Sequence, residues 1–324
     1  MQSCCTDSLL TTYYESSTYY NVHALKPSVF VVLPPTMGKK GKKAQAGKPK
    51  KLTPKDTSKR LNALTKNLEE ELEGADLFAP LPPTEDCAIC FVPLSRAERQ
   101  TFYQACCGKD ICKACYKENE ASINKQNEKN ADNKNKKPIP WTCPFCREPE
   151  PTGMEYTGRL QARCLQNDPI AFTLLGHRYQ MGECGSPKDD LKALDCFIRA
   201  VELGSADACT NIGVIYDKGI GVAVDKERAA LFERAGALRG DITARHNIGI
   251  SEFGFGNFEL GIRHWKIAAE AGDQPSLNNL RKIYNAGGKI PGNQFISQEE
   301  MDKIYRSGHD AQEEVKSEER EKHM

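Results

Sequence analysis

The sequence predicts a small zinc-stabilised finger followed by an all-α solenoid of paired-helix repeats. Two observations support this two-part fold. Four close pairs of cysteines lie between positions 87 and 146, and cysteines clustered at this spacing are typical of zinc sites. Further along the chain, short motifs return with a period in the mid-thirties, which is typical of stacked helix pairs.

Residues 1–54 are predicted to form a disordered tail with a lysine-rich segment. Residues 1–36 show neither helical nor strand periodicity, and the lysines of residues 39–51 are spaced by Gly, Ala and Pro. Such a segment cannot bury a core. Its lysines could also act as a nuclear address or a loose nucleic-acid contact. A start of translation at Met37 instead of Met1 is a further alternative.

Residues 55–83 are predicted to form an amphipathic helix and a proline linker. Leucines recur at three and four residues and therefore share one helix face, at Leu61, Leu64, Leu68 and Leu72. Four glutamates crowd the end of this helix, where the dipole prefers cations, so we expect the helix to dock on a neighbour. The prolines of residues 80–83 stiffen the connection that follows.

The cysteine pairs indicate two closed zinc sites. They are Cys87-x-x-Cys90, Cys106-Cys107, Cys112-x-x-Cys115 and Cys143-x-x-Cys146. Two residues between cysteines let a tight turn point both sulfurs at one tetrahedral ion. A redox motif would explain one such pair but not three pairs and a doublet. The surrounding apolar residues are too few for an independent core, so metal must supply most of the folding free energy, about 10 kcal/mol per ion.

These residues resemble the RING-type zinc finger over residues 86–147. The resemblance implies a RING-like α+β fold over residues 84–148 and two Zn²⁺ ions. It assigns the first ion to Cys87, Cys90, Cys112 and Cys115, and the second to Cys143, Cys146 and the middle pair. The chain departs from the family at Lys109, where histidine is usual, because a protonated amine is a poor ligand. Cys106 is the expected replacement beside Cys107; alternatively, Cys106 only packs as a small buried thiol.

A disordered insertion is predicted over residues 119–140, because Asn, Lys and Gln dominate there. Closing a longer loop costs only about 0.6 kcal/mol per doubling of its length, so the second site tolerates such an insertion.

Residues 168–288 are predicted to form the helical repeats. Asn211-Ile212-Gly213 returns 36 residues later as Asn247-Ile248-Gly249. Aromatic residues stand three positions before an alanine in each unit, at Phe197, Phe232 and Trp265. A glycine stop precedes an N-cap residue in each unit, at Gly204-Ser205, Gly240-Asp241 and Gly272-Asp273, and Asp168-Pro169 opens the first unit. Each unit is therefore a pair of helices.

The repeats resemble Sel-one-like repeats, which are relatives of the tetratricopeptide class. The matching motifs are Gly176-x-x-Tyr179, Gly213-x-x-Tyr216 and the loop Lys218-Gly219-x-Gly221-Val222. The resemblance implies an adaptor surface for proteins. Residues 297–324 are predicted as a C-terminal helix and a charged tail, with Ser297 and Glu300 as a capping box and Met301, Ile304 and Tyr305 sealing the last repeat.

No nucleophile arrangement, phosphate-binding loop or poised carboxylate pair is recognisable, so catalysis would have to act through a partner. The RING resemblance implies a ubiquitin-protein ligase that positions a ubiquitin-conjugating enzyme. It assigns the enzyme contact to Ile89 and Pro144, and a bridge between ubiquitin and enzyme to Arg147. Alternatively, Ile89 and Pro144 only shape the turns and Arg147 is a solvated charge. Asn119 departs from the family, since many active members carry a bulky apolar residue there.

Two other function classes compete with the ligase. The first is a zinc-stabilised protein-interaction scaffold without ligase activity. The second is nucleic-acid binding, which is weak because no basic residues interleave with aromatics in the cysteine turns. The formal net charge of +1 does not favour any particular class of partner.

The cellular compartment is predicted to be the cytoplasm or nucleus. No signal peptide or transmembrane segment is recognisable, and clustered cysteines in a reducing compartment are usually metal ligands. Four further cysteines show no metal spacing and are expected to be buried thiols in the repeats: Cys164, Cys184, Cys196 and Cys209. The dispersed histidines are expected to be ordinary repeat or surface residues.

Overall fold

The computed structural model describes residues 54–97, 100–130, 136–151, 153–182, 187–287 and 296–312. All of them lie in one compact unit, Thr53–Met324; the other unit, Met1–Leu52, lies outside the described residues. The predicted N-terminal tail, apart from Pro54, and the charged tail from residue 313 therefore also lie outside the described residues.

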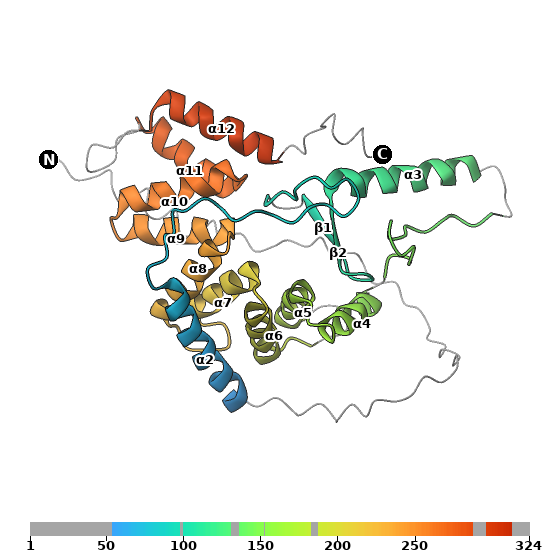
Figure 1. Cartoon of the computed structure of the whole chain (residues 1–324), viewed down its shortest axis with the longest axis horizontal. Helices are drawn as coiled ribbons and strands as arrows, with labels where there is room; N and C mark the ends of the chain where they lie inside the picture. The colour runs from blue at the N-terminus through green and yellow to red at the C-terminus, as the bar shows by residue number, and fades with distance from the viewer. Residues whose placement is uncertain are drawn as a thin grey trace. The chain divides into compact units, whose positions relative to one another are not determined.

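The described residues between 84 and 148, called the finger below, contain a small α+β unit (Figure 1). Strands β1 (Thr101–Gln104) and β2 (Lys109–Cys112) pair antiparallel, with Thr101 opposite Cys112 and Gln104 opposite Lys109. Helix α3 (Lys113–Asn130) follows β2 directly. Its Tyr116 ring stacks on Phe102 of β1, with ring centroids 4.2 Å apart. The apolar core is small and includes Leu94 and Ile111 beside four buried cysteines, so the sulfur cluster occupies the centre of this unit.

The prediction of a disordered insertion over 119–140 is wrong for residues 119–130, which form most of α3. Glu, Ala, Lys and Gln in this segment are good helix formers, and neither Gly nor Pro interrupts them. Ile123 is buried. The Asn127 amide accepts a hydrogen bond from the Ile139 amide (2.7 Å) and donates to the Ile139 carbonyl (3.0 Å). The returning chain is thereby held to the helix. Residues 131–135 lie outside the described residues.

The solenoid consists of paired helices, as the repeat period predicts (Figure 1). The three pairs are α5 (Pro169–Met181) with α6 (Asp190–Glu202), α7 (Ala206–Lys218) with α8 (Lys226–Leu238), and α9 (Ile242–Gly254) with α10 (Phe258–Glu270). The side chains of Asp168, Ser205, Asp241 and Asp273 accept hydrogen bonds from backbone amides at the starts of α5, α7, α9 and α11. The predicted caps are thus present.

The aromatic residue of each unit is fully buried. A Cβ atom at Gly176 would lie 2.7 Å from the Phe197 ring, and one at Gly249 would lie 2.5 Å from the Trp265 ring. Glycine at these two positions therefore lets the two helices of a unit approach closely around the aromatic side chain.

Two helices flank the repeats. Helix α4 (Gly153–Cys164) was not predicted; its Leu160 is fully buried and packs with Ala171 and Leu175 of α5. Helices α11 (Gln274–Asn285) and α12 (Gln298–Gln312) close the other end. Met301 and Ile304 of α12 are buried as predicted. The prediction for Tyr305 is wrong, because this side chain is exposed.

Helix α2 (Pro54–Leu72) docks on α6 and α8. All four leucines of its apolar face, Leu61, Leu64, Leu68 and Leu72, are buried in one cluster with residues of α6, α7 and α8. Arg60 forms ion pairs with Asp195 (2.5 Å) and Glu202 (3.0 Å) of α6. Glu71, near the end of the helix, pairs with Arg239 at 2.6 Å. A cation from the solenoid therefore compensates part of the acidic end.

Candidate metal centres

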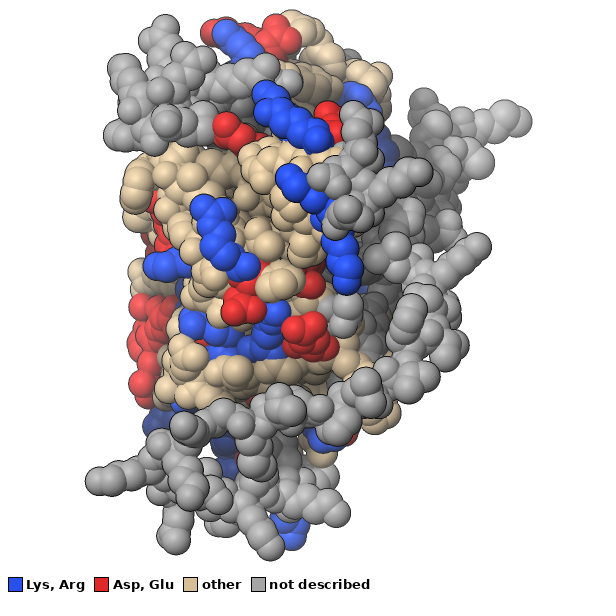
Figure 2. All heavy atoms as spheres, turned by 90° about the vertical axis from the view of Figure 1, so that its right-hand side faces the viewer, with Lys and Arg blue, Asp and Glu red and all other residues tan. Residues whose placement is uncertain are grey.

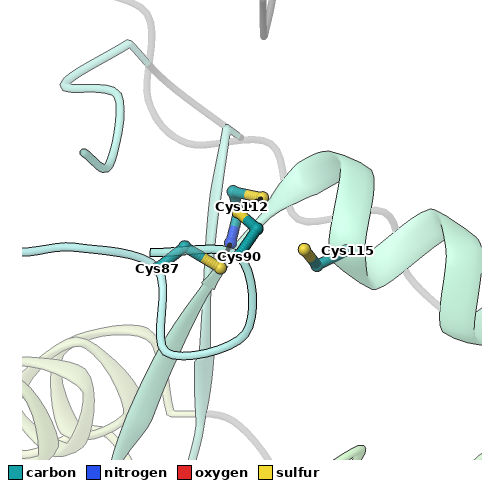
Figure 3. A group of neighbouring side chains, drawn as sticks. All are labelled: Cys87, Cys90, Cys112 and Cys115. Atoms are coloured by element: carbon teal, nitrogen blue, oxygen red, sulfur yellow. Dashed lines mark hydrogen bonds between the residues drawn. The ribbon is translucent and has the colours of Figure 1, made fainter. Parts of the chain in front are cut away.

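The first cysteine group joins the first and third pairs. It contains Cys87, Cys90, Cys112 and Cys115, whose Sγ atoms all lie within 4.8 Å of one another, and all four residues are buried. Figure 3 shows the four side chains gathered between the turn at 87–90, the end of β2 and the start of α3. The Cys90 and Cys112 Sγ atoms are 3.7 Å apart. The backbone amides of Ile89 and Cys112 donate to the Cys87 Sγ at 3.5 and 3.4 Å.

The second group joins the middle doublet and the last pair. Its ligand atoms belong to Cys106, Cys107, Cys143 and Cys146 and again lie within 4.8 Å of one another. The Cys107 and Cys143 Sγ atoms are 3.7 Å apart. Cys143 is buried, Cys106 and Cys107 are half-buried, and Cys146 is exposed. Water therefore reaches the second group more easily than the first.

The first and last cysteine turns have the same local geometry. In the first turn, the Cys87 amide donates to the Val92 carbonyl and the Phe91 amide donates to the Cys87 carbonyl. In the last turn, the Cys143 amide donates to the Glu148 carbonyl and the Arg147 amide donates to the Cys143 carbonyl. Phe91 and Arg147 both have positive φ, 56° and 62°. In each turn, the residue with the left-handed backbone conformation reverses the direction of the chain. Both sulfurs of the turn can therefore face the same point.

The two groups fit a tetrahedral metal ion. A Zn–S bond of about 2.3 Å in a tetrahedron separates neighbouring sulfurs by about 3.8 Å, close to the 3.7 Å found in each group. Four thiol ligands without a carboxylate suit a soft or borderline ion such as Zn²⁺ and not Mg²⁺ or Ca²⁺. Both cysteine groups could therefore hold a metal ion.

The thiols of the two groups differ in acidity. The hydrogen bond with the Cys112 thiol, helped by backbone amides, lowers the pKa of Cys87 to about 4 against the opposing effect of burial. Burial raises the pKa of Cys115 to about 12 and that of Cys107 to about 11. Each group therefore keeps protons at neutral pH that a metal ion would displace.

The pairs interleave along the chain, since pairs one and three form one group and pairs two and four form the other. The β1–β2 hairpin carries ligands of both groups: the doublet follows β1, and Cys112 ends β2. Binding of an ion in one group therefore fixes chain segments that the other group needs.

The three predicted contact residues occupy the two cysteine turns. Ile89 and Pro144 lie between the cysteines of their turns and are half-buried, and Arg147 is exposed. Sequence reasoning missed Phe91 and Phe145, which are 66% and 36% exposed in the same turns. The available signal was an apolar residue in a cysteine turn, because the finger has too small a core to bury such a side chain. Asn119 donates a hydrogen bond to the Thr142 carbonyl at 3.0 Å, so its side chain holds the last turn to α3.

The finger also contacts the solenoid through polar side chains that the sequence did not single out. The Tyr103 hydroxyl donates to the Asp168 carboxylate at 2.7 Å, and Arg163 donates to the same oxygen at 3.0 and 2.8 Å. Arg96 donates to the Gly240 carbonyl at 3.1 Å. Among the described residues drawn in Figure 2, basic and acidic side chains are interspersed, and neither sign forms a continuous patch on that face.

The fold and the two cysteine groups define a helical-repeat protein with two candidate metal centres. The Sel1 repeat family model matches residues 171–205, 206–240 and 244–273. This match confirms that the predicted repeats are Sel1 repeats. No curated protein matches the chain.

Solved structures that are similar to the chain include the following two. A Sel1 repeat protein from Oxalobacter formigenes is 28% identical with a TM-score of 0.42, over 48% of this chain and 64% of that one. A protective antigen of uropathogenic Escherichia coli strains with an SLR fold is 24% identical with a TM-score of 0.41, over 48% and 33% of the two chains. The chain thus spans less than two thirds of either relative. No helix in the described part of the chain combines the length and apolar character needed to cross a bilayer.

Proposed function

We propose that the protein is a RING-type ubiquitin-protein ligase, in which two Zn²⁺ ions organise the finger and the Sel1 repeats recruit protein partners. The observation that supports the finger assignment is the interleaved arrangement of the two cysteine groups. Four-thiolate zinc sites of this kind are closed and leave no position for a substrate. The ions would therefore supply folding free energy and shape, and the ligase reaction would take place on the partner enzyme.

The protein's contribution would be positioning. Ile89 and Pro144 present apolar surface from the two equivalent turns, and we propose that they contact the ubiquitin-conjugating enzyme. Arg147 directly follows the last cysteine, with its side chain exposed. A planar guanidinium carries several donors and can bridge two protein surfaces at once. Holding the charged enzyme in one orientation favours attack by a substrate lysine, since positioning lowers the entropic part of the barrier.

The Sel1 repeats support a protein-interaction role, because a stack of helix pairs presents an extended surface suited to a peptide or helix. We propose that this surface recruits the substrate or an adaptor. We further propose a reducing compartment, the cytoplasm or nucleus, because clustered cysteines there are usually metal ligands.

Asn119 favours a second candidate, a zinc-stabilised interaction scaffold without ligase activity. The side chain is polar, and its amide is bound to the Thr142 carbonyl. Asn119 therefore offers no apolar contact to a conjugating enzyme, whereas many active RING fingers carry a bulky apolar residue at this position.

An autoubiquitination assay separates the two candidates. Purified full-length protein is combined with activating enzyme, ubiquitin and a panel of conjugating enzymes. We expect ubiquitin chains on the wild type, their loss in Arg147→Ala, and their retention in Arg281→Ala, which changes an exposed arginine of α11. Metal content is measured for all three proteins. Inactivity of metal-loaded wild type across the panel would contradict the ligase and support the scaffold.

A further inference from the structure

A cluster of cationic side chains forms where the linker after α2 meets the solenoid. Arg96 comes from the finger, Arg245 from α9, and Arg263 and His264 from α10. Arg245 and His264 are only 2% and 3% exposed. Arg96 is half-buried and Arg263 is exposed. The cluster therefore has a buried floor and an accessible rim.

The contacts of these groups are with neutral partners. Arg245 Nη1 donates to the Leu77 carbonyl at 2.5 Å, and Arg96 donates to the carbonyls of Gly240 and Pro82. The Arg263 guanidinium lies 3.7 Å from the centre of the Phe78 ring, which also contacts the His264 ring at 4.7 Å. Carbonyl oxygens and a ring face hold these arginines in place, and the nearby carboxylates of Asp241 and Asp76 offset part of the charge of Arg96 and Arg245.

Two buried polar atoms of the cluster have no hydrogen-bond partner, Arg245 Nε and His264 Nδ1. Buried polar atoms are nearly always satisfied by protein, water or ligand, so two orphans on one floor point to a missing partner. Burial lowers the pKa of Arg245, and the charge of Arg96 lowers it further, while Asp76 opposes them. Burial, Arg245 and Arg263 lower the pKa of His264 to about 4, so the imidazole is neutral at pH 7.

We propose that Arg96, Arg245 and Arg263 bind a small multivalent oxyanion of the phosphate class. Guanidinium groups present planar forks of donors that match phosphate oxygens. An anion at this place accepts hydrogen bonds that Arg245 Nε lacks, and it offsets the repulsion between arginines contributed by three segments. It thereby ties the finger and its linker to α9 and α10. This site is separate from the cysteine groups and does not depend on ligase activity.

Isothermal titration calorimetry with the metal-loaded full-length protein tests the proposal, using pyrophosphate, inorganic phosphate and sulfate as probes at constant ionic strength. We expect one pyrophosphate per chain and weaker binding of the less charged sulfate. Arg263→Gln, which removes an exposed rim donor, should weaken pyrophosphate binding about tenfold. Arg281→Gln, an equal charge change on α11, should leave the affinity unchanged. Zinc analysis after the titration verifies that the probe has not removed metal.

Arg245→Met provides a second test, because it removes the floor of the site while keeping an apolar stem. It should abolish the stoichiometric binding, with circular dichroism verifying the helical fold. The proposal is overturned if wild-type protein binds no pyrophosphate at millimolar concentration. It is also overturned if Arg263→Gln binds as tightly as Arg281→Gln.

Discussion

Replacing Cys106 by serine tests the second candidate metal centre at the cysteine that stands in for the usual histidine. The four sulfurs of this group lie within 4.8 Å of one another, and Cys106 is half-buried beside Cys107. A serine hydroxyl is a poor zinc ligand because it remains protonated at neutral pH, whereas thiolate binds strongly. We therefore expect Cys106→Ser to weaken the second site and to leave the first group, which contains no part of the doublet, intact.

The expected loss of zinc affinity follows from the part of the binding free energy that one ligand contributes. A structural zinc ion contributes about 10–16 kcal/mol to a folded four-ligand site, or about 3 kcal/mol per ligand if the four share it evenly. Such a loss weakens the affinity of the second site about 100-fold. The first site keeps its four ligands and should be affected only through the shared β1–β2 hairpin, so its affinity should fall far less than that of the second site.

Competition with a chromophoric chelator measures both sites in one titration. We expect two tight ions per chain for the wild type, and one tight and one weakened ion for Cys106→Ser. Cys164→Ser is the matched control, because Cys164 is a half-buried thiol of α4 outside both groups. Two tight ions in Cys106→Ser would refute the assignment and support a packing role for this thiol.

Three further predictions concern the solenoid. Leu68→Ala, at a side chain 1% exposed, should lower the free energy of unfolding in urea by about 2–5 kcal/mol, whereas Lys66→Ala on the exposed face of α2 should change it little. Gly249→Ala places a Cβ 2.5 Å from the Trp265 ring and should lower the free energy of unfolding by about 1–3 kcal/mol. The control Gly254→Ala, where nothing lies within 4 Å of the added Cβ, should not destabilise the protein. Equal effects of the two substitutions would refute the close-packing explanation. Burial first, and then the charge of Asp217, raise the pKa of Glu233 to about 8, above about 4.3 in the unfolded chain. Between these two pKa values the folded state holds a proton that the unfolded state has lost. The contribution of Glu233 to stability is therefore full below pH 4 and is lost as pH rises towards 8. Urea unfolding at pH 5 and pH 8 should show this loss in the wild type and a smaller loss in Glu233→Gln.

The solenoid could be predicted because its signals are local and repeat. Each glycine stop followed by Ser or Asp specifies a helix boundary by itself, and the caps at Ser205, Asp241 and Asp273 occur in the structure. The docking of α2 was also predictable, since a helix with a leucine face needs a partner. Which helices it contacts could not be deduced, because the ion pairs of Arg60 and Glu71 join residues more than 130 positions apart.

The finger was harder to predict in its polar parts. Composition suggested disorder after residue 119, but the Asn127 contacts with Ile139 and the buried Ile123 stabilise α3. The linkage of Tyr103 and Arg163 to Asp168 could not be recognised either, because Asp168 is already explained as a helix cap. Tertiary hydrogen bonds of this kind leave no periodic trace in a sequence.

X-ray absorption at the zinc edge, together with elemental analysis of freshly purified full-length protein, tests the two metal centres most directly. The proposed zinc finger requires two zinc ions per chain, each surrounded by four sulfur atoms at about 2.3 Å. Fewer than two ions, or nitrogen and oxygen atoms in the first coordination sphere, would contradict the pairing of eight cysteines into two closed sites.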